Sequence, residues 1–156
     1  MTPKDLERYL RDHIPLSKAM DISVISVDPD AVLLRAPLAP NINHRDTVFG
    51  GSSSALAILA AWSLLHTRLR AEGIDSQLVL QRNTMTYDKP ILGDFTARSS
   101  LARAEDWPKF TRTLARKGKA RLTVTAVLLD DGKIVGKLEG EFVAIGKANS
   151  PNNPTK

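Results

Sequence analysis

The sequence feature that most constrains the fold is a polar loop that ends in two glycines and leads directly into an apolar helix. The loop spans 41–52 and reads Asn-Ile-Asn-His-Arg-Asp-Thr-Val-Phe-Gly-Gly-Ser. The helix is expected at about 51–71, and Gly73 lies just past its end, as at many helix C-termini. Leucine, isoleucine, tryptophan and alanine cover nearly its whole circumference, and a helix that is apolar all round is buried all round. The rest of the chain must therefore wrap around this helix.

Most of the remaining segments have the alternating pattern of β-strands, so this is the one long helix that we expect. Asp28-Pro29-Asp30 is a turn sequence, and Asp-Asp-Gly-Lys at 130–133 predicts a hairpin. A break containing Trp107 and Pro108 is expected at 104–109. The strands are expected at 22–27 and 32–36 before the helix and at 77–87, 94–102, 121–129 and 134–145 after it.

A short amphipathic helix is expected at the N-terminus. Thr2 is a typical N-cap residue, Pro3 suits the first helical position and Pro15 ends the helix. Because 156 residues is a usual length for a single domain, we expect residues 1–146 to form one domain. The polar residues 147–156 are expected to form a disordered tail. The face of the N-terminal helix that lies on the domain consists of Leu6, Tyr9, Leu10 and His13.

The order of elements is strand, strand, long buried helix and then four mostly antiparallel strands. This order predicts an α+β protein in which an antiparallel sheet wraps around one long central helix, which is the hot-dog fold. A single sheet covers only part of such a helix, so a second copy of the chain is its natural cover. We therefore expect a homodimer with the strand at 77–87 among its contacts.

The composition excludes several kinds of site. The 156 residues include no cysteine, which rules out disulfides, thiolate metal sites and a cysteine nucleophile. His13, His44 and His66 lack the spacing of a zinc motif, so no metal is expected. The N-terminus has no signal-peptide core, and no apolar run reaches the ~20 residues that span a bilayer. We therefore expect a cytoplasmic protein without a membrane partner.

The charge of the chain favours an acidic partner. The formal net charge is +5 and the pI about 9.7, which suits a phosphate-bearing cofactor or an acidic carrier protein. Nucleic acid is not expected, because aromatic residues make up only 5% of the chain and no base-stacking motif is present. A basic segment at 112–121 could bind the phosphates of coenzyme A or phosphopantetheine; a solvated turn between two elements is the alternative.

The two glycines favour a site for a carbonyl oxygen at the start of the helix. Gly50 and Gly51 let a ligand approach the backbone closely. The first N–H groups of a helix have no internal partner and carry partial positive charge, so they can stabilise a developing oxyanion. Tight entry into the helix is the alternative role. Asn41 and Asn43 add neutral amides nearby, which can donate to an oxyanion but cannot act as a general base; turn formation is their alternative role.

Acidic residues are missing where a hydrolase of this architecture often has one. No Asp or Glu occurs from 47 to 71, so only His44, Asp46 or Asp88 is left to activate water. The serines at 52–54 belong to the first helical turn and have no evident His–acid pair. Loss of carbon dioxide from a malonyl thioester needs enolate stabilisation and no such base, so it suits this site better than hydrolysis.

The loop and helix together resemble a known family. Ala39-Pro40-Asn41-Ile42-Asn43, then Thr47, then Phe49-Gly50-Gly51-Ser52 and the apolar helix are similar to stand-alone hot-dog proteins labelled as thioesterases. The same domain occurs C-terminal to an acetyltransferase domain. The family is associated with decarboxylation of malonyl-acyl carrier protein to acetyl-acyl carrier protein, which primes fatty acid synthesis. The resemblance covers roughly residues 6–144.

This resemblance implies a site and a partner. An asparagine of the loop is critical for decarboxylation in that family, and by position it corresponds to Asn43. No cofactor is implied, since the substrate brings its own phosphopantetheine arm on acyl carrier protein or coenzyme A. Two alternatives remain: a thioesterase in which His44 or Asp46 positions water, and a non-catalytic protein that binds acyl thioesters. The expected site residues are Asn41, Asn43, Phe49, Gly50, Gly51 and Ser52, and the expected carrier-binding residues are Arg116, Lys117, Lys119 and Arg121.

Overall fold

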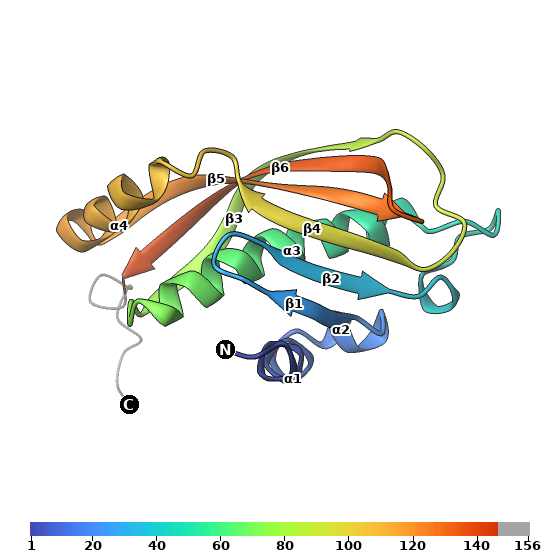
Figure 1. The fold of residues 1–156 in the computed structure, drawn as a ribbon, viewed down its shortest axis with the longest axis horizontal. Helices are drawn as coiled ribbons and strands as arrows, with labels where there is room; N and C mark the ends of the chain where they lie inside the picture. Colours follow the sequence, from blue (N-terminus) through green and yellow to red (C-terminus); the bar gives the residue numbers. More distant parts are fainter. Residues whose placement is uncertain (147–156) are drawn as a thin grey trace, which may run out of the picture.

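One antiparallel sheet of six strands curves around the long apolar helix (Figure 1). The computed structural model describes residues 1–146; the tail expected at 147–156 lies outside the described residues. Neighbouring strands follow the order β1-β2-β4-β5-β6-β3, so β1 and β3 are the edges. The elements are α1 (Pro3–His13), α2 (Pro15–Ala19), β1 (Ser23–Val27), β2 (Val32–Ala36), the short 3₁₀ helix η1 (Ala39–Asn41), α3 (Gly50–Ala71), β3 (Ser76–Tyr87), β4 (Phe95–Leu101), α4 (Asp106–Lys117), β5 (Lys119–Asp130) and β6 (Lys133–Gly146).

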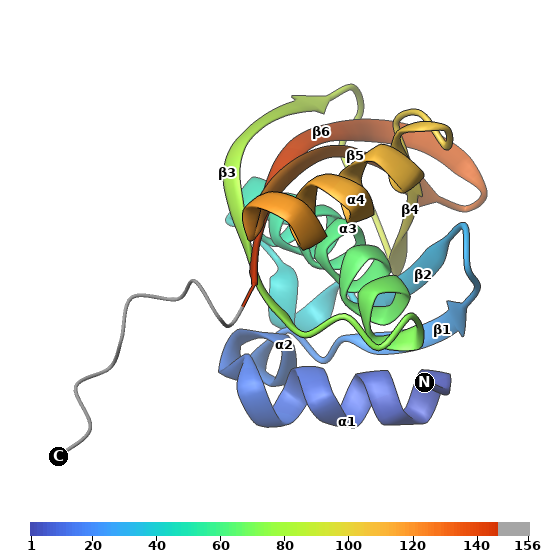
Figure 2. The ribbon, with the colours of Figure 1, turned by 90° about the vertical axis from the view of Figure 1, so that its left-hand side faces the viewer.

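The central helix α3 is buried over most of its surface, but not all round as its sequence predicts. The sheet arches over it, and α1 and α2 lie on the other side of the molecule (Figure 2). Leu56, Leu64 and Leu65 have no solvent exposure, whereas Ile58 and Trp62 are only half-buried. The Trp62 indole N–H donates to the carbonyl of Leu78 at 3.1 Å and so joins α3 to the first residues of β3. The α+β hot-dog fold is confirmed.

The strands expected from the alternating pattern are also confirmed, including the hairpin between β5 and β6. Asp131 and Gly132 have positive φ angles of 50° and 74°, which is the backbone conformation of a tight two-residue hairpin turn. At the N-terminus, the Thr2 side chain accepts a hydrogen bond from the Asp5 N–H and caps α1. Pro15 does end α1, but it also begins the short helix α2, which the sequence did not indicate.

The expected break at 104–109 is wrong, because a second amphipathic helix, α4, begins there. Trp107, Phe110 and Leu114 form its buried face, and Gly118 ends it in the left-handed region with a φ of 70°. Pro108 does not interrupt α4, since it is the third helical residue, where the N–H has no partner within the helix. The first half of the basic segment is therefore helical and is not a turn.

The α4 helix lies beside the C-terminal end of α3. The Trp107 indole N–H donates to a carboxylate oxygen of Glu72 at 2.8 Å. The Arg68 guanidinium stacks on the Trp107 ring at 4.2 Å from its centroid, a favourable cation–π geometry. These contacts hold α4 far from the beginning of α3, as Figure 1 shows.

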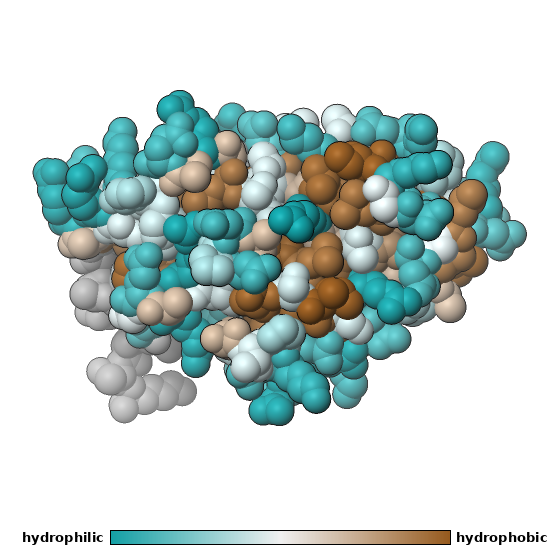
Figure 3. Space-filling model, viewed as in Figure 1, coloured by the Kyte–Doolittle hydropathy of each residue, from teal (hydrophilic) through white to brown (hydrophobic). Residues whose placement is uncertain are grey.

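Two features of the surface bear on partners. The edge strand β3 pairs only with β6 and is exposed along most of its length, including Val79 at 50% and Tyr87 at 57%. Apolar surface also gathers near the middle of the face in Figure 3 and somewhat to the right of it. None of the helices among residues 1–146 is long and apolar enough to span a membrane.

Candidate functional site at the start of α3

The loop before α3 is held to the body of the fold by Asn41. This residue is only 2% exposed, and its Nδ2 donates to the carbonyls of Met20 at 3.0 Å and Pro37 at 2.8 Å. Its Oδ1 is buried and has no hydrogen-bond partner among the described residues. The amide therefore fixes the end of η1 against the segment that precedes β1.

The side chain of Asn43 closes the loop upon itself. Its Oδ1 accepts from the N–H of Arg45 at 2.8 Å and of Thr47 at 3.1 Å, while Nδ2 donates to the Thr47 hydroxyl at 2.8 Å. The Asn43 N–H also donates to the Thr47 carbonyl at 2.8 Å. An asparagine suits this turn because its short amide can bond the backbone two to four residues onward. In this arrangement the amide is occupied within the loop.

Backbone hydrogen bonds then set where the loop enters the helix. The Val48 N–H donates to the carbonyl of Ile91 at 2.9 Å, and the Phe49 N–H donates to the carbonyl of Asn41 at 2.8 Å. Ile42 and Val48 form an isolated β-bridge. The start of α3 is thus fixed from two sides, by the end of η1 and by the segment that leads from β3 to β4.

The first two residues of α3 present free backbone donors. The N–H groups of Ser52 and Ser53 both donate to the carbonyl of Phe49, at 2.9 and 3.1 Å. Those of Gly50 and Gly51 donate to no acceptor among residues 1–146. No side chain caps the helix, and no acidic residue lies in its first turn. The positive end of the helix dipole is therefore uncompensated and can receive an oxygen that carries negative charge.

A cavity of about 330 Å³ opens at this end of the helix. The Tyr87 ring lies across it from Gly50, 3.6 Å from where a Cβ at position 50 would stand. Asp88 and Lys89 follow Tyr87 in the lining, and Ile91 and Leu128 form part of its apolar wall. From the sequence, Asp88 was one of three candidates to activate water. Tyr87 was not a candidate, because a tyrosine at the end of a strand does not by itself indicate a site.

The residues expected at the site do not all meet at this cavity. Gly50 and Asp88 line it, and so does Ser53, whose hydroxyl donates to the Gly50 carbonyl at 2.9 Å. His44 and Asp46 are exposed at the tip of the loop and do not line the cavity. The Phe49 side chain, 58% exposed, folds over Gly51, and Ser52 is half-buried in the first turn.

The expected carrier-binding cations lie at the other end of the molecule. Arg116 and Lys117 occupy the last turn of α4, and Lys119 and Arg121 begin β5; all four are exposed. A helix of 22 residues is ~33 Å long, so these cations and Gly50 are separated by nearly the length of α3. Among residues 1–146, no group of three or more His, Asp or Glu side chains is arranged to hold a metal ion.

The fold and the start of α3 together define a hot-dog domain with a candidate oxyanion site. The chain belongs to the YiiD_C family, described as "Putative thioesterase (yiiD_Cterm)", whose profile matches residues 3–146.

Solved structures share the fold of this chain. A protein of unknown function from Chlorobaculum tepidum TLS is 31% identical with a TM-score of 0.88, and the match covers 94% of this chain and 98% of that one. A "putative thioesterase" from Shewanella oneidensis is 24% identical with a TM-score of 0.79, covering 92% and 96%. A thioesterase from Haemophilus influenzae, at 14% identity and a TM-score of 0.75 over 97% and 96%, shares the fold.

Proposed function

We propose that this protein is an enzyme that acts on acyl thioesters at the N-terminus of α3. The observation that carries the proposal is the pair of unpaired N–H groups of Gly50 and Gly51 at the positive end of a buried helix, beside a cavity. A thioester oxygen placed there would gain negative charge during reaction. Fixed backbone donors stabilise such charge more in the transition state than in the substrate.

Hydrolysis is the reaction that the family description supports. Water would attack the carbonyl carbon, and the tetrahedral intermediate would expel the thiol and leave a carboxylic acid. Asp88 is the carboxylate in the lining of the cavity and would take the proton from the attacking water and return it to the departing sulfur. Asp88 therefore replaces His44 and Asp46 as the candidate base.

Decarboxylation of a malonyl thioester is the second candidate, and the absence of acidic residues from 47 to 71 favours it. The carbon–carbon bond to the carboxylate would break, carbon dioxide would leave, and the electron pair would form an enolate that then takes a proton from solvent. The backbone donors at Gly50 and Gly51 would hold the enolate oxygen. Asn43 would hold the loop in place or turn its amide toward the substrate.

Product analysis separates these reactions. The purified protein is incubated with malonyl-carrier protein and with a series of acyl-CoA thioesters. Acetyl-carrier protein and carbon dioxide identify decarboxylation, whereas a free acid and a free thiol identify hydrolysis. Binding without turnover of any thioester would contradict both and leave an acyl-thioester binding protein. Asp88→Asn should abolish hydrolysis and spare decarboxylation.

We further propose that the working form is a homodimer paired through β3. The free edge of this strand and the exposed Val79 and Tyr87 support it. Antiparallel pairing about a two-fold axis would place the beginning of one β3 beside the end of the other. The cations at 116–121 of one protomer would then lie toward the cavity of its partner, where they could receive an acidic carrier protein. A monomer at micromolar concentration in analytical ultracentrifugation would contradict this arrangement.

A further inference from the structure

A cavity of about 330 Å³ lies between α4 and the first residues of β5, and its volume is within the ~300–1,000 Å³ of small-molecule sites. Residues 120–123 of β5 form one wall. The facing wall is one side of α4, which runs alongside β5 in Figure 2; its four residues at helical spacing are Asp106, Lys109, Phe110 and Thr113. None of the lining residues belongs to β3, so this cavity lies outside the edge of the proposed dimer contact.

On the side of this cavity, the start of β5 has no neighbouring strand. β4 ends at Leu101, which pairs with Val124, so residues 119–123 extend past the end of β4. The α4 helix lies beside this part of β5 instead. Since a helix covers the edge, a further strand cannot add to it, and the cavity leaves room for a smaller molecule.

The backbone groups on this edge include a free acceptor beside a free donor. The Gly118 carbonyl accepts from the Gly146 N–H at 2.8 Å, so along the antiparallel ladder every second residue from 119 to 123 turns its N–H and C=O groups away from β6 and toward α4. The Thr123 carbonyl accepts from the Ala102 N–H at 3.2 Å, which agrees with this direction. Within residues 1–146, the Arg121 carbonyl and the Thr123 N–H have no hydrogen-bond partner on this side.

Two cations without an ion-pair partner line the cavity. Lys109 and Arg121 take part in none of the ion pairs formed within residues 1–146. The two carboxylates of the lining are already compensated. Glu141 lies 3.9 Å from Arg82, and Asp106 lies in the first turn of α4, at the positive end of the helix dipole. The cavity therefore favours an anionic group such as a phosphate.

Adenine is complementary to the free edge. Its N6 amino group donates next to a ring nitrogen that accepts, which matches a strand carbonyl followed two residues later by an N–H. A base with a carbonyl in place of the amino group would instead meet the Arg121 carbonyl with a second acceptor. The apolar part of the lining, which can contact the base, consists of Phe110, Ala120 and Leu122.

We propose that this cavity binds an adenine nucleotide, with the base on the backbone of Arg121 and Thr123 and the phosphate on the side chains of Lys109 and Arg121. Free ADP and the adenosine end of coenzyme A share this chemistry. The binding claim does not depend on the proposed function. If both hold, the cavity recognises the nucleotide end of an acyl-CoA substrate. Only β6 and β3 separate β5 from the proposed dimer contact, a distance of ~10 Å, so the pantetheine chain would extend toward the cavity of the partner.

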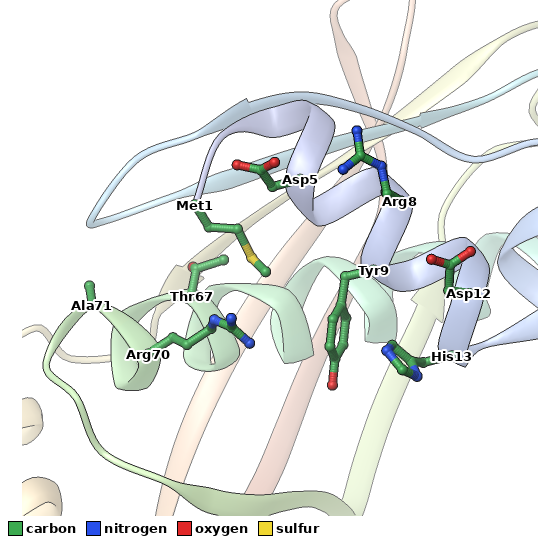
Figure 4. A pocket seen from close by; sticks show the side chains of 9 residues that line it. All are labelled: Met1, Asp5, Arg8, Tyr9, Asp12, His13, Thr67, Arg70 and Ala71. Atoms are coloured by element: carbon green, nitrogen blue, oxygen red, sulfur yellow. The ribbon is translucent and has the colours of Figure 1, made fainter.

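The test is calorimetric titration of the full chain with ADP, compared with IDP, in which a carbonyl replaces the N6 amino group. We expect saturable binding of ADP, and binding of IDP weaker by about tenfold or more. Lys109→Gln and Arg121→Gln should each weaken ADP binding by about tenfold, because each removes a charge-assisted bond to phosphate. Arg8→Gln removes an exposed cation beside a different cavity, between α1 and α3 (Figure 4), and is the matched control that should bind as the unaltered protein does.

Nuclear magnetic resonance of the isotope-labelled protein locates the ligand. The N–H signal of Thr123 should shift with ADP and with coenzyme A, but not with phosphopantetheine, which lacks the base. Tighter binding of coenzyme A than of ADP identifies coenzyme A as the ligand, and the reverse order identifies a free nucleotide. Either order supports the proposal.

Three results would overturn the proposal. Equal affinity for ADP and IDP would show that the base is not read by the backbone. An unchanged Thr123 N–H signal at saturating ADP would show that the nucleotide lies elsewhere. Absence of saturable heat with both ADP and coenzyme A would show that no adenine nucleotide binds. Failure to process thioesters would leave all three readouts intact, so the two proposals fail separately.

Discussion

The ring of Phe49 lies over the Cα of Gly51, so close that a Cβ at position 51 would collide with Cε1 of the ring and stand 2.9 Å from its Cζ. At Gly50 the nearest atom to an added Cβ is 3.6 Å away, on the Tyr87 ring, which is an ordinary contact. The two glycines therefore differ: position 51 has no room for a side chain while the Phe49 ring lies there, and position 50 has room.

Gly51→Ala should displace the Phe49 ring from the start of α3 without unfolding the domain. The ring is an exposed side chain that can rotate away, and alanine favours a helix by up to ~1 kcal/mol relative to glycine. We expect a melting temperature equal to or slightly above that of the unaltered protein, but thioester turnover reduced about tenfold or more, because substrate contact at the free N–H groups changes. Gly50→Ala adds a methyl group beside the Tyr87 ring without displacing Phe49, so it shows how much of the loss comes from the Phe49 ring. A fully active Gly51→Ala protein would show that the position of the Phe49 ring does not affect turnover.

Asn43→Ala should destabilise the loop as well as reduce activity. The substitution removes the acceptor for the Arg45 and Thr47 N–H groups and the donor to the Thr47 hydroxyl, which we expect to cost about 1–3 kcal/mol in the free energy of unfolding. Thr47→Val removes one of these partners and should cost less. Denaturant unfolding and turnover are measured on both variants. If Asn43→Ala loses turnover at unchanged stability, then the amide acts on the substrate and does not simply brace the loop.

The sequence predicts a helix or a turn well where a clear local pattern indicates it. The nearly all-apolar circumference of the helix at 51–71 favours a position inside a curved sheet, and the Asp-Gly pair at 131–132 needs the positive φ angles that it has. The α4 helix was missed because Trp107-Pro108 is a common loop sequence and because the three apolar residues of its buried face are spread over eight positions among charged ones. This spacing cannot be recognised within any four consecutive residues.

Local sequence indicates only part of the candidate site. Gly50 and Gly51 belong to the helix that they begin, so their backbone donors could be placed directly. Tyr87 and Asp88 lie 37 and 38 residues after Gly50, at and just past the end of β3. Their meeting at the cavity depends on how the sheet curves around α3. The separation of Arg116 from Gly50 is likewise a property of α4 packing on Glu72, which no local pattern encodes.

Trp107→Phe should destabilise the protein by about 1–2 kcal/mol. It removes the hydrogen bond to the Glu72 carboxylate and weakens the stacking of Arg68, while the smaller ring preserves part of the buried contact with Phe110. Glu72→Gln keeps an acceptor for the indole N–H and is the milder control. Thermal unfolding measures both. An unchanged melting temperature for Trp107→Phe would mean that α4 is held by its apolar face alone.

Reversal of three cations, Arg116→Glu, Lys117→Glu and Lys119→Glu, should raise the KM for a carrier-linked substrate about tenfold or more at low salt, because an acidic carrier is then repelled. The KM for the same acyl group on a short pantetheine arm should not change, since that arm brings no acidic surface. Reversal of Lys4, Lys18 and Arg98 is the control with an equal change of net charge. If the two triple variants had equal KM values for the carrier substrate, the cations at 116, 117 and 119 would be solvent-exposed residues without a role in carrier binding.

Stability should depend on pH through His66. Folding lowers the pKa of this ring from 6.5 to about 4, first because of burial and then because of Arg70. Between these values the unfolded chain binds a proton that the native protein does not, so the free energy of unfolding falls as pH drops below 6.5. The ring is partly exposed, so we expect a loss of only about 1–2 kcal/mol by pH 4. Because His66→Gln cannot take up the proton, its melting temperature should depend less on pH between pH 7 and pH 4.5. If the dependence were as steep as that of the unaltered protein, other titratable groups would cause it.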